Sequence, residues 1–249
     1  MKNILNQIIE NKKKELRYKK SSSNFVRVFS QPNRRSIALI AEIKLASPSG
    51  GVMGNAKDIS KRAKMYEQAG ADAISVVVDR KYFAGDYEFI RQAKKVTSLP
   101  ILAKDFVIDP YQIYEAKIAG ASAVLLIAKI LNKETLKRFV KLAFSIGLEP
   151  VVEVGNEQEL GVALSSETIC LGVNARDLVT FKVSIEKACT IGRKIPDSRL
   201  FIGFSGVKTR HDVERYKSAG AKAILVGTAL MKGDNNKKLI RDLRGTPNQ

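Results

Sequence analysis

The sequence contains few of the residues that build metal centres or disulfide frameworks, and it lacks the long apolar run of a membrane span. It has one histidine, two cysteines and no tryptophan among 249 residues. Cys170 and Cys189 cannot by themselves form a disulfide framework or a metal cluster, and a reducing, cytoplasmic setting fits them best. No run of about 18 apolar residues occurs, so no membrane span is expected. The lysine-rich N-terminus also lacks the apolar region of a secretory signal.

Acidic residues are scarce relative to basic ones. Lysine and arginine number 43 against 25 aspartates and glutamates, which gives a net charge of +18. Such a field attracts polyanions, so nucleic-acid binding is one hypothesis. The basic residues are spread along the chain, however, without interleaved aromatics that stack on bases. We therefore favour solvated helix faces, expect no nucleic-acid partner, and note that a small anionic substrate would gain from the same field.

A pattern of alanines around a glycine, Ala-Gly-Ala-x-Ala, occurs three times, with its glycine at Gly70, Gly120 and Gly220. Each glycine follows a helix-like segment and suits a helix end with positive φ. Each is followed by a short run that is apolar throughout. Strands that are apolar rather than alternating are typical of a parallel sheet covered by helices.

Eight such strands are expected along the chain. They are Ile37–Ile43, Ile74–Val78, Ile101–Ala103, Val124–Ala128, Pro150–Glu153, Ile169–Val173, Leu200–Gly203 and Ile224–Val226. Helical patterns between them include Lys57–Ala69, Tyr87–Val96, Tyr111–Ala119, Lys133–Ser145 and His211–Ala219. This alternation predicts the α/β class and a (β/α)₈ barrel, the TIM-barrel fold. A doubly wound open sheet is the alternative, and the lack of a glycine-rich dinucleotide fingerprint after the first strand counts against it.

The chain is expected to be one domain spanning residues 1–249, because α/β barrels reach about 250 residues as single domains. Residues 1–35 precede the first strand and are expected to form a helical cap or lid over one end of the barrel, which comprises residues 36–249. The apolar positions of this helix are Ile4, Ile8, Ile9 and Leu16. The sequence leaves the oligomeric state open, with a monomer favoured.

Charged and polar residues gather where the expected strands end, which is where TIM barrels place their active sites. Glu42 and Lys44 are two apart on a strand and so point to the same side. Lys104 follows an apolar strand, where partial desolvation would suit it to proton transfer. Glu153 and Asn174 end two further strands. A buried structural ion pair is the alternative for each, but five polar strand ends are hard to explain as structure alone, since buried charge is costly.

Two glycine-containing loops follow the seventh and eighth strands. They are Ser205-Gly206 and Gly227-Thr228. Backbone N–H groups of such loops can hold a phosphate, and a helix over 228–232 would point its N-terminus at that anion. Two ordinary strand-to-helix turns are the alternative interpretation.

Several longer segments are specific enough to indicate a family. They are Ile40–Lys44 with Ser47-Pro48-Ser49, Lys81-Tyr82-Phe83 with Gly85, Lys104-Asp105-Phe106, Asp109–Ile113, Asn174 with Arg176-Asp177-Leu178, and Leu225–Met231. On these residues the chain resembles the indole-3-glycerol-phosphate synthases from about Ile4 to Met231.

The resemblance implies a carboxy-lyase of tryptophan biosynthesis. In this reaction 1-(o-carboxyphenylamino)-1-deoxyribulose 5-phosphate closes a ring, loses CO₂ and then loses water, giving indole-3-glycerol phosphate. No metal and no organic cofactor is implied. Ring closure beside a carbonyl needs an acid, and dehydration needs an acid and a base, which agrees with the charged strand ends.

The resemblance also implies roles for individual residues. Lys104 would be the general acid of ring closure and Glu153 would transfer protons during dehydration. Lys44 would contact the substrate carboxylate or take part in proton transfer, positioned by Glu42, and Asn174 would orient substrate hydroxyls. The residues expected to bind the phosphate region are Ser47, Arg176, Ser205, Gly206, Gly227 and Thr228. Phe83 and Phe106 would line the pocket for the aromatic ring.

One position departs from the family pattern. The seventh strand of these enzymes usually ends Glu-Ser-Gly, and this chain has Phe204-Ser205-Gly206. Loss of a positioned polar group can lower a rate by about 10²–10³-fold. The sequence therefore predicts an active but slower synthase. The alternatives are a barrel acting on a related phosphosugar or arylamine, and a degenerate barrel that only binds phosphate.

Overall fold

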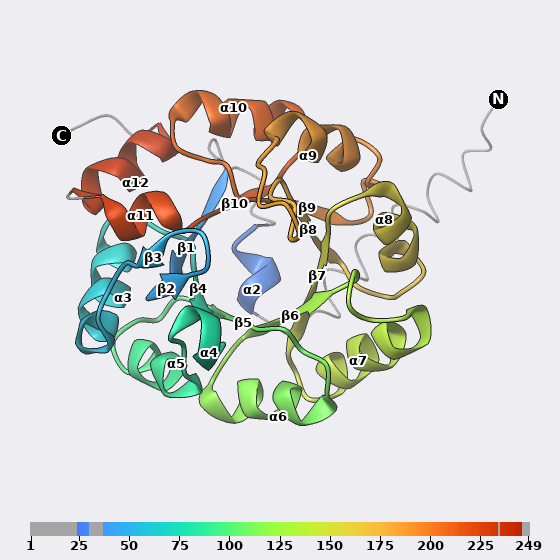
Figure 1. Ribbon diagram of the computed structural model, residues 1–249, viewed down its shortest axis with the longest axis horizontal. Helices are drawn as coiled ribbons and strands as arrows, with labels where there is room; N and C mark the ends of the chain where they lie inside the picture. Colours follow the sequence, from blue (N-terminus) through green and yellow to red (C-terminus); the bar gives the residue numbers. More distant parts are fainter. Residues whose placement is uncertain (1–23, 30–36, 234, 246–249) are drawn as a thin grey trace.

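The computed structural model describes residues 24–29, 37–233 and 235–245, and its centre is a closed barrel of parallel strands (Figure 1). The eight strands are β1 (Ala38–Ile43), β4 (Ala73–Val77), β5 (Ile101–Lys104), β6 (Ala123–Ile127), β7 (Glu149–Val154), β8 (Cys170–Asn174), β9 (Leu200–Phe204) and β10 (Ala223–Val226). β1 pairs in parallel with both β4 and β10, which closes the sheet. The predicted TIM barrel is confirmed, and the open-sheet alternative is wrong because no barrel strand is left at an edge.

Helices surround this barrel on the outside (Figure 1). They are α3 (Ile59–Gln68), α5 (Tyr87–Lys94), α6 (Pro110–Ala119), α7 (Lys133–Ser145), α8 (Glu157–Leu164), α9 (Ile185–Gly192), α10 (Arg210–Ser218), α11 (Thr228–Lys232) and α12 (Asn236–Arg244). Most begin at a residue whose side-chain oxygen accepts a hydrogen bond from the first turn, such as Asn132 before α7 and Ser184 before α9. Gly70, Gly120 and Gly220 have φ of 92°, 95° and 94°, as the repeat predicts.

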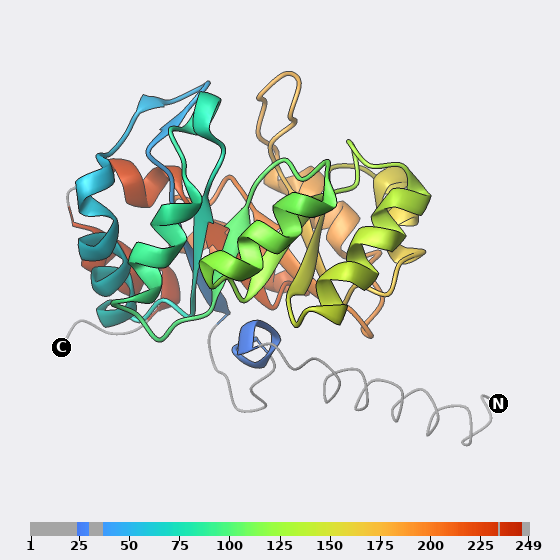
Figure 2. The same cartoon turned by 90° about the horizontal axis from the view of Figure 1, so that it is seen from below.

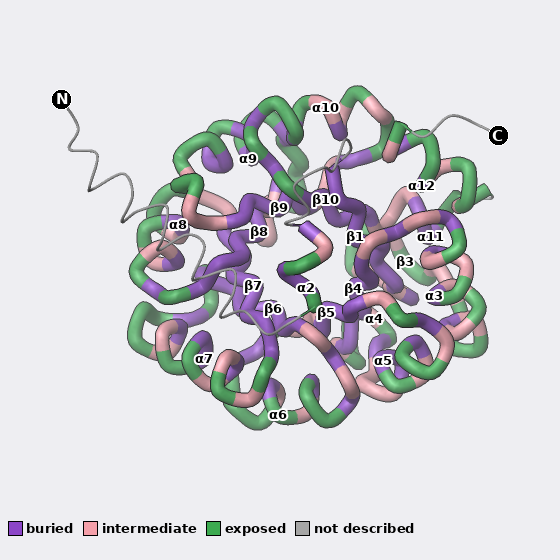
Figure 3. The backbone as a smooth tube through the Cα atoms, turned by 180° about the vertical axis from the view of Figure 1, so that it is seen from behind, coloured by how far each residue is buried: buried purple, intermediate pink, exposed green. Residues whose placement is uncertain are grey.

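Side chains alternate between two buried layers along each strand, because successive residues point to opposite faces. On β5, Ile101 and Ala103 pack outward against the helices, while Leu102 packs into the barrel. The eight barrel strands are buried except at their last residues Lys104 and Asn174, and Figure 3 shows them as a buried ring inside partly exposed helices. This alternation decides which residues can reach the interior.

The short helix α2 (Asn24–Arg27) covers the end of the barrel at which the strands begin (Figure 2). Phe25, Val26 and Phe29 are buried in one cluster with strand-starting residues such as Ala38 and Ala123. This described part of the N-terminal extension therefore lies opposite the ends where the strands finish. The helix predicted over Ile4–Leu16 lies outside the described residues.

Two smaller features extend from the opposite end of the barrel (Figure 2). One is a two-stranded antiparallel hairpin after β1, made of β2 (Ala46–Ser47) and β3 (Gly51–Val52). The other is the loop after β8, which is closed by a bridge between Arg176 and Val183. The short helix α4 (Arg80–Phe83) follows β4 on the side of the hairpin.

Phe204 ends β9 and points into the barrel, where its side chain is 1% exposed. Its ring occupies the space in front of Gly172 on the neighbouring strand β8. A Cβ atom at position 172 would lie 2.5 Å from ring atoms Cε2 and Cζ of Phe204, well inside van der Waals contact. The large residue on β9 therefore requires the absence of a side chain on β8.

Gly172→Ala is expected to destabilise the protein by about 2 kcal/mol, because overpacking a core typically costs ~1–3 kcal/mol. Urea unfolding of the wild type and the variant measures this difference. In a Phe204→Leu background the same change should cost less than half as much, since the ring that it meets is gone. Equal costs in the two backgrounds would show that the contact is not the cause.

Candidate active site

Four polar side chains point inward at the end of the barrel where the strands finish, which we call the mouth. Glu42, Lys104 and Glu153 each follow, at a spacing of two, a residue of the inward-facing cluster, such as Leu102 before Lys104, and Asn174 follows Cys170 of that cluster at a spacing of four. Because side chains alternate along a strand, these four also face inward. They come from β1, β5, β7 and β8, so only closure of the barrel brings them to one place.

Glu42 and Lys44 form an ion pair at the end of β1. The Lys44 Nζ atom lies 3.1 Å from Glu42 Oε1, and Glu42 is 4% exposed. Lys44 Nζ also donates a hydrogen bond of 3.4 Å to Thr228 Oγ1 at the start of α11. Any side chain at Gly227 would overlap the Glu42 carboxylate. The first strand and the last strand-to-helix turn thus form one charged corner of the mouth.

Glu153 has one bonded and one unbonded carboxylate oxygen. Its Oε1 accepts a hydrogen bond of 2.9 Å from Asn174 Nδ2, and the Asn174 Oδ1 accepts one of 2.9 Å from the Arg176 amide. These two bonds fix the orientation of the Asn174 amide. Glu153 is only 2% exposed, and its Oε2 has no hydrogen-bond partner among the described residues. A buried acceptor without a donor is costly, so Glu153 presents a polar group that is ready for a ligand.

A cavity of about 260 Å³ lies beside Glu153 and Asn174. The cations on its lining are Lys129, Arg176, Lys182 and Lys187, and its acidic residues besides Glu153 are Glu159 and Asp177. Glu159 is already bonded to the Gly155 amide and to Asn156 Nδ2. The lining offers both hydrogen-bonding and cationic groups, which suits a polar ligand that carries negative charge.

Lys104 is the last residue of β5 and is half-buried. Its ammonium makes no hydrogen bond or ion pair with another side chain in the part of the chain that the structure describes. Phe106 follows Lys104 by two residues, and its ring packs beside that of Phe83, with centroids 6.0 Å apart and planes tilted by 38°. The arrangement combines a proton donor with an aromatic wall.

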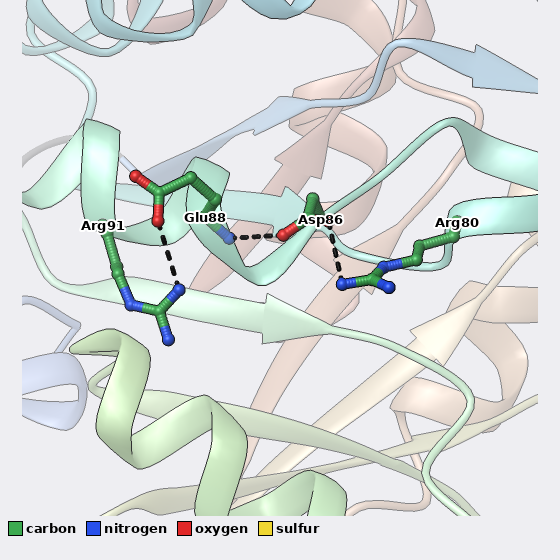
Figure 4. Close-up of polar contacts among 4 residues, drawn as sticks. All are labelled: Arg80, Asp86, Glu88 and Arg91. Atoms are coloured by element: carbon green, nitrogen blue, oxygen red, sulfur yellow. Dashed lines mark hydrogen bonds and ion pairs between the residues drawn. The ribbon is translucent and has the colours of Figure 1, made fainter.

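Ion pairs stabilise the connection that carries Phe83 (Figure 4). The Arg80 guanidinium lies 3.1 Å from Asp86, and Asp86 accepts a hydrogen bond from the Glu88 amide at the start of α5. Glu88 and Arg91 pair one turn further along, at 3.2 Å. Exposed pairs of this kind contribute less than about 1 kcal/mol each. Their effect is to hold the short connection between α4 and α5 in one conformation.

The two predicted phosphate loops occupy the β9 and β10 side of the mouth. Ser205 and Gly206 have φ of 67° and 85°, a pair of left-handed residues that turns the chain sharply after β9. The Tyr216 hydroxyl holds this turn by donating to the carbonyls of Phe204 and Ser205 at 3.1 and 3.0 Å. Thr228 begins α11, which covers the predicted range of 228–232.

The other predicted binding residues lie further out. Ser47 is in the β2–β3 hairpin, paired with Gly51. Arg176 lies on the cavity beside Asn174, and its Nη1 donates to the Phe181 carbonyl at 3.2 Å. The structure therefore places Arg176 at the β8 loop, beside Glu153.

Sequence analysis did not identify some of the polar residues near the mouth. Lys129 follows β6 by two residues and lines the cavity. Ser75 on β4 pairs in register with Glu42 and is fully buried, with a hydroxyl that has no partner among the described residues. The signal for Ser75 was available, since it is the one polar residue in an apolar strand. Tyr87 and Gln112 both bond to Asp105, but their spacing in the sequence does not indicate this contact.

The cysteines are packing residues in this structure. Burial raises the pKa of the Cys170 thiol well above its usual range and also raises the pKa of Cys189. Neither is therefore a thiolate nucleophile at neutral pH. Within the described ranges, no group of three or more histidine, cysteine, aspartate or glutamate residues could hold a metal ion. The same ranges contain no helix that is both long enough and apolar enough to cross a membrane.

Solved structures with similar backbones are barrel enzymes. A 3-hexulose-6-phosphate synthase superposes with a TM-score of 0.66 at 16% identity, covering 84% of this chain and 99% of that one. A tryptophan synthase complex from Pyrococcus furiosus gives a TM-score of 0.62 at 17% identity, with 84% and 99% covered. At these identities the likeness supports the fold alone.

Sequence relatives are much closer. An indole-3-glycerol phosphate synthase of Caldanaerobacter subterraneus subsp. tengcongensis is 42% identical, covering 97% of this chain and 99% of the relative. One of Shouchella clausii is 43% identical, with 83% and 82% covered. A family model described as indole-3-glycerol phosphate synthase matches residues 2–243. Because the match spans nearly the whole chain and includes the charged strand ends of the mouth, this protein belongs to the indole-3-glycerol phosphate synthase family.

Proposed function

We propose that the chain converts 1-(o-carboxyphenylamino)-1-deoxyribulose 5-phosphate into indole-3-glycerol phosphate, acting as a carboxy-lyase of tryptophan biosynthesis. The observation that carries the proposal is the pair of unengaged groups at the mouth. Among the residues that the structure describes, the Lys104 ammonium has no side-chain partner and the buried Oε2 of Glu153 has no donor. Family membership supports the same reaction.

Lys104 is the general acid in this proposal. Ring closure joins an aromatic carbon to the substrate ketone carbon, and the ketone oxygen must gain a proton as the new C–C bond forms. Loss of CO₂ then restores the aromatic ring, because the electron pair of the broken bond returns to it. A half-buried ammonium at the strand end can donate the proton, and a positioned acid contributes about 10²–10⁴-fold in rate.

Glu153 handles protons in the final dehydration. Loss of the hydroxyl as water requires protonation of the leaving oxygen and removal of a proton from the neighbouring ring CH2 carbon, so that the C=C bond of the indole forms and the ring nitrogen keeps its proton. The free Oε2 of Glu153 can accept or return a proton, while Oε1 stays bonded to Asn174. Asn174 therefore keeps the carboxylate in one orientation during the exchange, and its amide can also orient substrate hydroxyls.

The remaining residues bind and orient the substrate. Lys44 pairs with Glu42 and donates a hydrogen bond to Thr228. It therefore places positive charge beside the turns at Ser205-Gly206 and Gly227-Thr228, where the phosphate would bind. Ser47 borders the same side from the hairpin. The Phe83 and Phe106 rings provide an apolar wall for the aromatic ring, and Arg176 adds a cation on the cavity beside Asn174. The working form is expected to be a cytoplasmic monomer.

A second candidate rests on Phe204. This side chain is buried and apolar at the position where the family usually has glutamate, so the mouth contains Glu42 and Glu153 without a third carboxylate on β9. A barrel with this interior could act on a related phosphosugar or arylamine. If the synthase substrate raises the melting temperature without being turned over, the second candidate is favoured.

Lys104→Ala is expected to lower kcat/KM at least about 10³-fold, since it removes the proton donor of ring closure. Indole fluorescence after addition of the substrate measures turnover, and a chain without tryptophan gives a low background. Lys95→Ala, an exposed lysine at the end of α5, is the matched control and should retain full activity. Activity of Lys104→Ala within tenfold of the wild type would rule out the assigned role.

Glu153→Gln should separate activity from stability. The variant loses the proton-transfer group, so kcat is expected to fall about 10²-fold or more. It also removes a buried charge with an unbonded oxygen, so the melting temperature should stay the same or rise. Turnover assays and thermal unfolding on the same preparations test both parts. A melting temperature that falls together with activity would indicate that Glu153 is a structural residue.

A further inference from the structure

The connection between β5 and α6, residues 105–109, is held by the side chain of Gln112. Its Oε1 accepts hydrogen bonds from the amides of Ile108 and Asp109 at 2.9 and 3.1 Å. Its Nε2 donates to Asp105 Oδ2 at 3.0 Å and to the Phe106 carbonyl at 3.1 Å. A glutamine side chain has two donors and two acceptor sites. All four are used on this one connection.

Asp105 extends the network to a second helix. Its Oδ1 accepts a hydrogen bond of 2.9 Å from the Phe106 amide. Its Oδ2 accepts one of 3.1 Å from the hydroxyl of Tyr87, the first residue of α5, in addition to the bond from Gln112. Burial, together with the nearby Asp105 carboxylate, raises the pKa of Tyr87. The hydroxyl therefore remains a donor throughout the physiological pH range.

Helix capping alone does not explain this arrangement. The start of α6 is a capping box, in which Asp109 bonds to the first turn and Gln112 bonds back to the Asp109 amide. That function needs only the Oε1 side of Gln112. The Nε2 bonds reach instead toward Asp105 and Phe106, the two residues that follow Lys104 directly.

We propose that Tyr87, Asp105 and Gln112 are positioning residues, which hold Lys104 and Phe106 in the catalytic geometry before substrate binds. The inference rests on the proposed function of Lys104 as general acid. Lys104 pairs with Val77 of β4 as the last residue of β5, and the network begins at Asp105 directly after it, so its backbone is held on both sides. Preorganisation of this kind is kinetically important, because a displacement of about 1 Å can lower a rate by ~10²-fold.

Gln112→Glu tests the proposal because it retains the capping box at the start of α6. The variant keeps the Oε1 acceptor and the capping box, for which glutamate is favoured, but it loses both Nε2 donors and places a second carboxylate against Asp105. We expect kcat to fall about tenfold with KM changing less than twofold. The double substitution Asp105→Asn with Gln112→Glu restores the bond between the two side chains with donor and acceptor exchanged. It does not restore the bonds to the Phe106 carbonyl and from the Tyr87 hydroxyl, so only part of the lost kcat should return.

Tyr87→Phe removes one hydroxyl at the other end of the network, and a smaller fall in kcat, about fivefold, is expected. Thr168→Val is the matched control. The Thr168 hydroxyl is also buried and bonds to backbone carbonyls, with 2.8 Å to Pro150, but it lies at the start of β8, opposite the mouth. This control should lower the melting temperature to a similar extent and leave kcat unchanged.

Hydrogen exchange does not depend on turnover, so it tests the positioning inference separately from the proposed synthase function. The Phe106 amide donates to Asp105 Oδ1, a bond that neither Tyr87→Phe nor Gln112→Glu deletes. Its hydrogen exchange should be at least about tenfold faster in both variants and unchanged in Thr168→Val. If the wild-type protein shows no turnover, the proposed function fails and this exchange rate decides the inference. The inference is overturned if exchange at Phe106, or kcat where turnover exists, matches that of the Thr168→Val control.

Discussion

Closure of the parallel sheet is the constraint on which the rest of this molecule depends. Each strand has a hydrogen-bonded neighbour on both sides, so every second side chain must enter a narrow interior. Apolar residues fill that space at the levels of Leu102 and Ile202, and α2 covers the end below them. The Phe204 ring from β9 fills the space in front of Gly172 on β8, which has no side chain. Charged residues on the described strands therefore lie near strand ends, with Glu42, Lys104 and Glu153 where the strands finish and Glu149 at the start of β7.

The charged residues at the mouth are in two different electrostatic situations. Glu42 is nearly buried but is neutralised by Lys44, which also contacts the start of α11. Glu153 is equally buried and is bonded to the neutral amide of Asn174, and its other oxygen has no donor within the described ranges. A paired charge favours structure and binding, whereas a buried acceptor without a donor is costly and is available to a ligand that can donate to it.

Much of the fold could be predicted because it follows from local patterns. The boundaries expected for Lys133–Ser145 and for 228–232 agree with α7 and α11, since apolar spacing and turn residues define helix ends locally. The hairpin after β1 was missed because strands of two residues have no periodicity to detect. The network around Asp105 was missed for a different reason. Its partners come from α5 and α6, and only the packing of these helices on adjacent strands brings Tyr87 to the connection.

By itself, the sequence determined the strand count, the barrel, the family motifs and the side of each strand that a polar residue takes, because alternation along a strand is a property of the backbone. Only the tertiary structure decided which polar groups are satisfied. Asn174 is bonded to Glu153, Lys44 donates to Thr228, and Lys104 has no side-chain partner among the described residues. These contacts join strands and loops that are far apart in the chain. Their distances are set by barrel closure and helix packing, for which no short stretch of sequence contains the information.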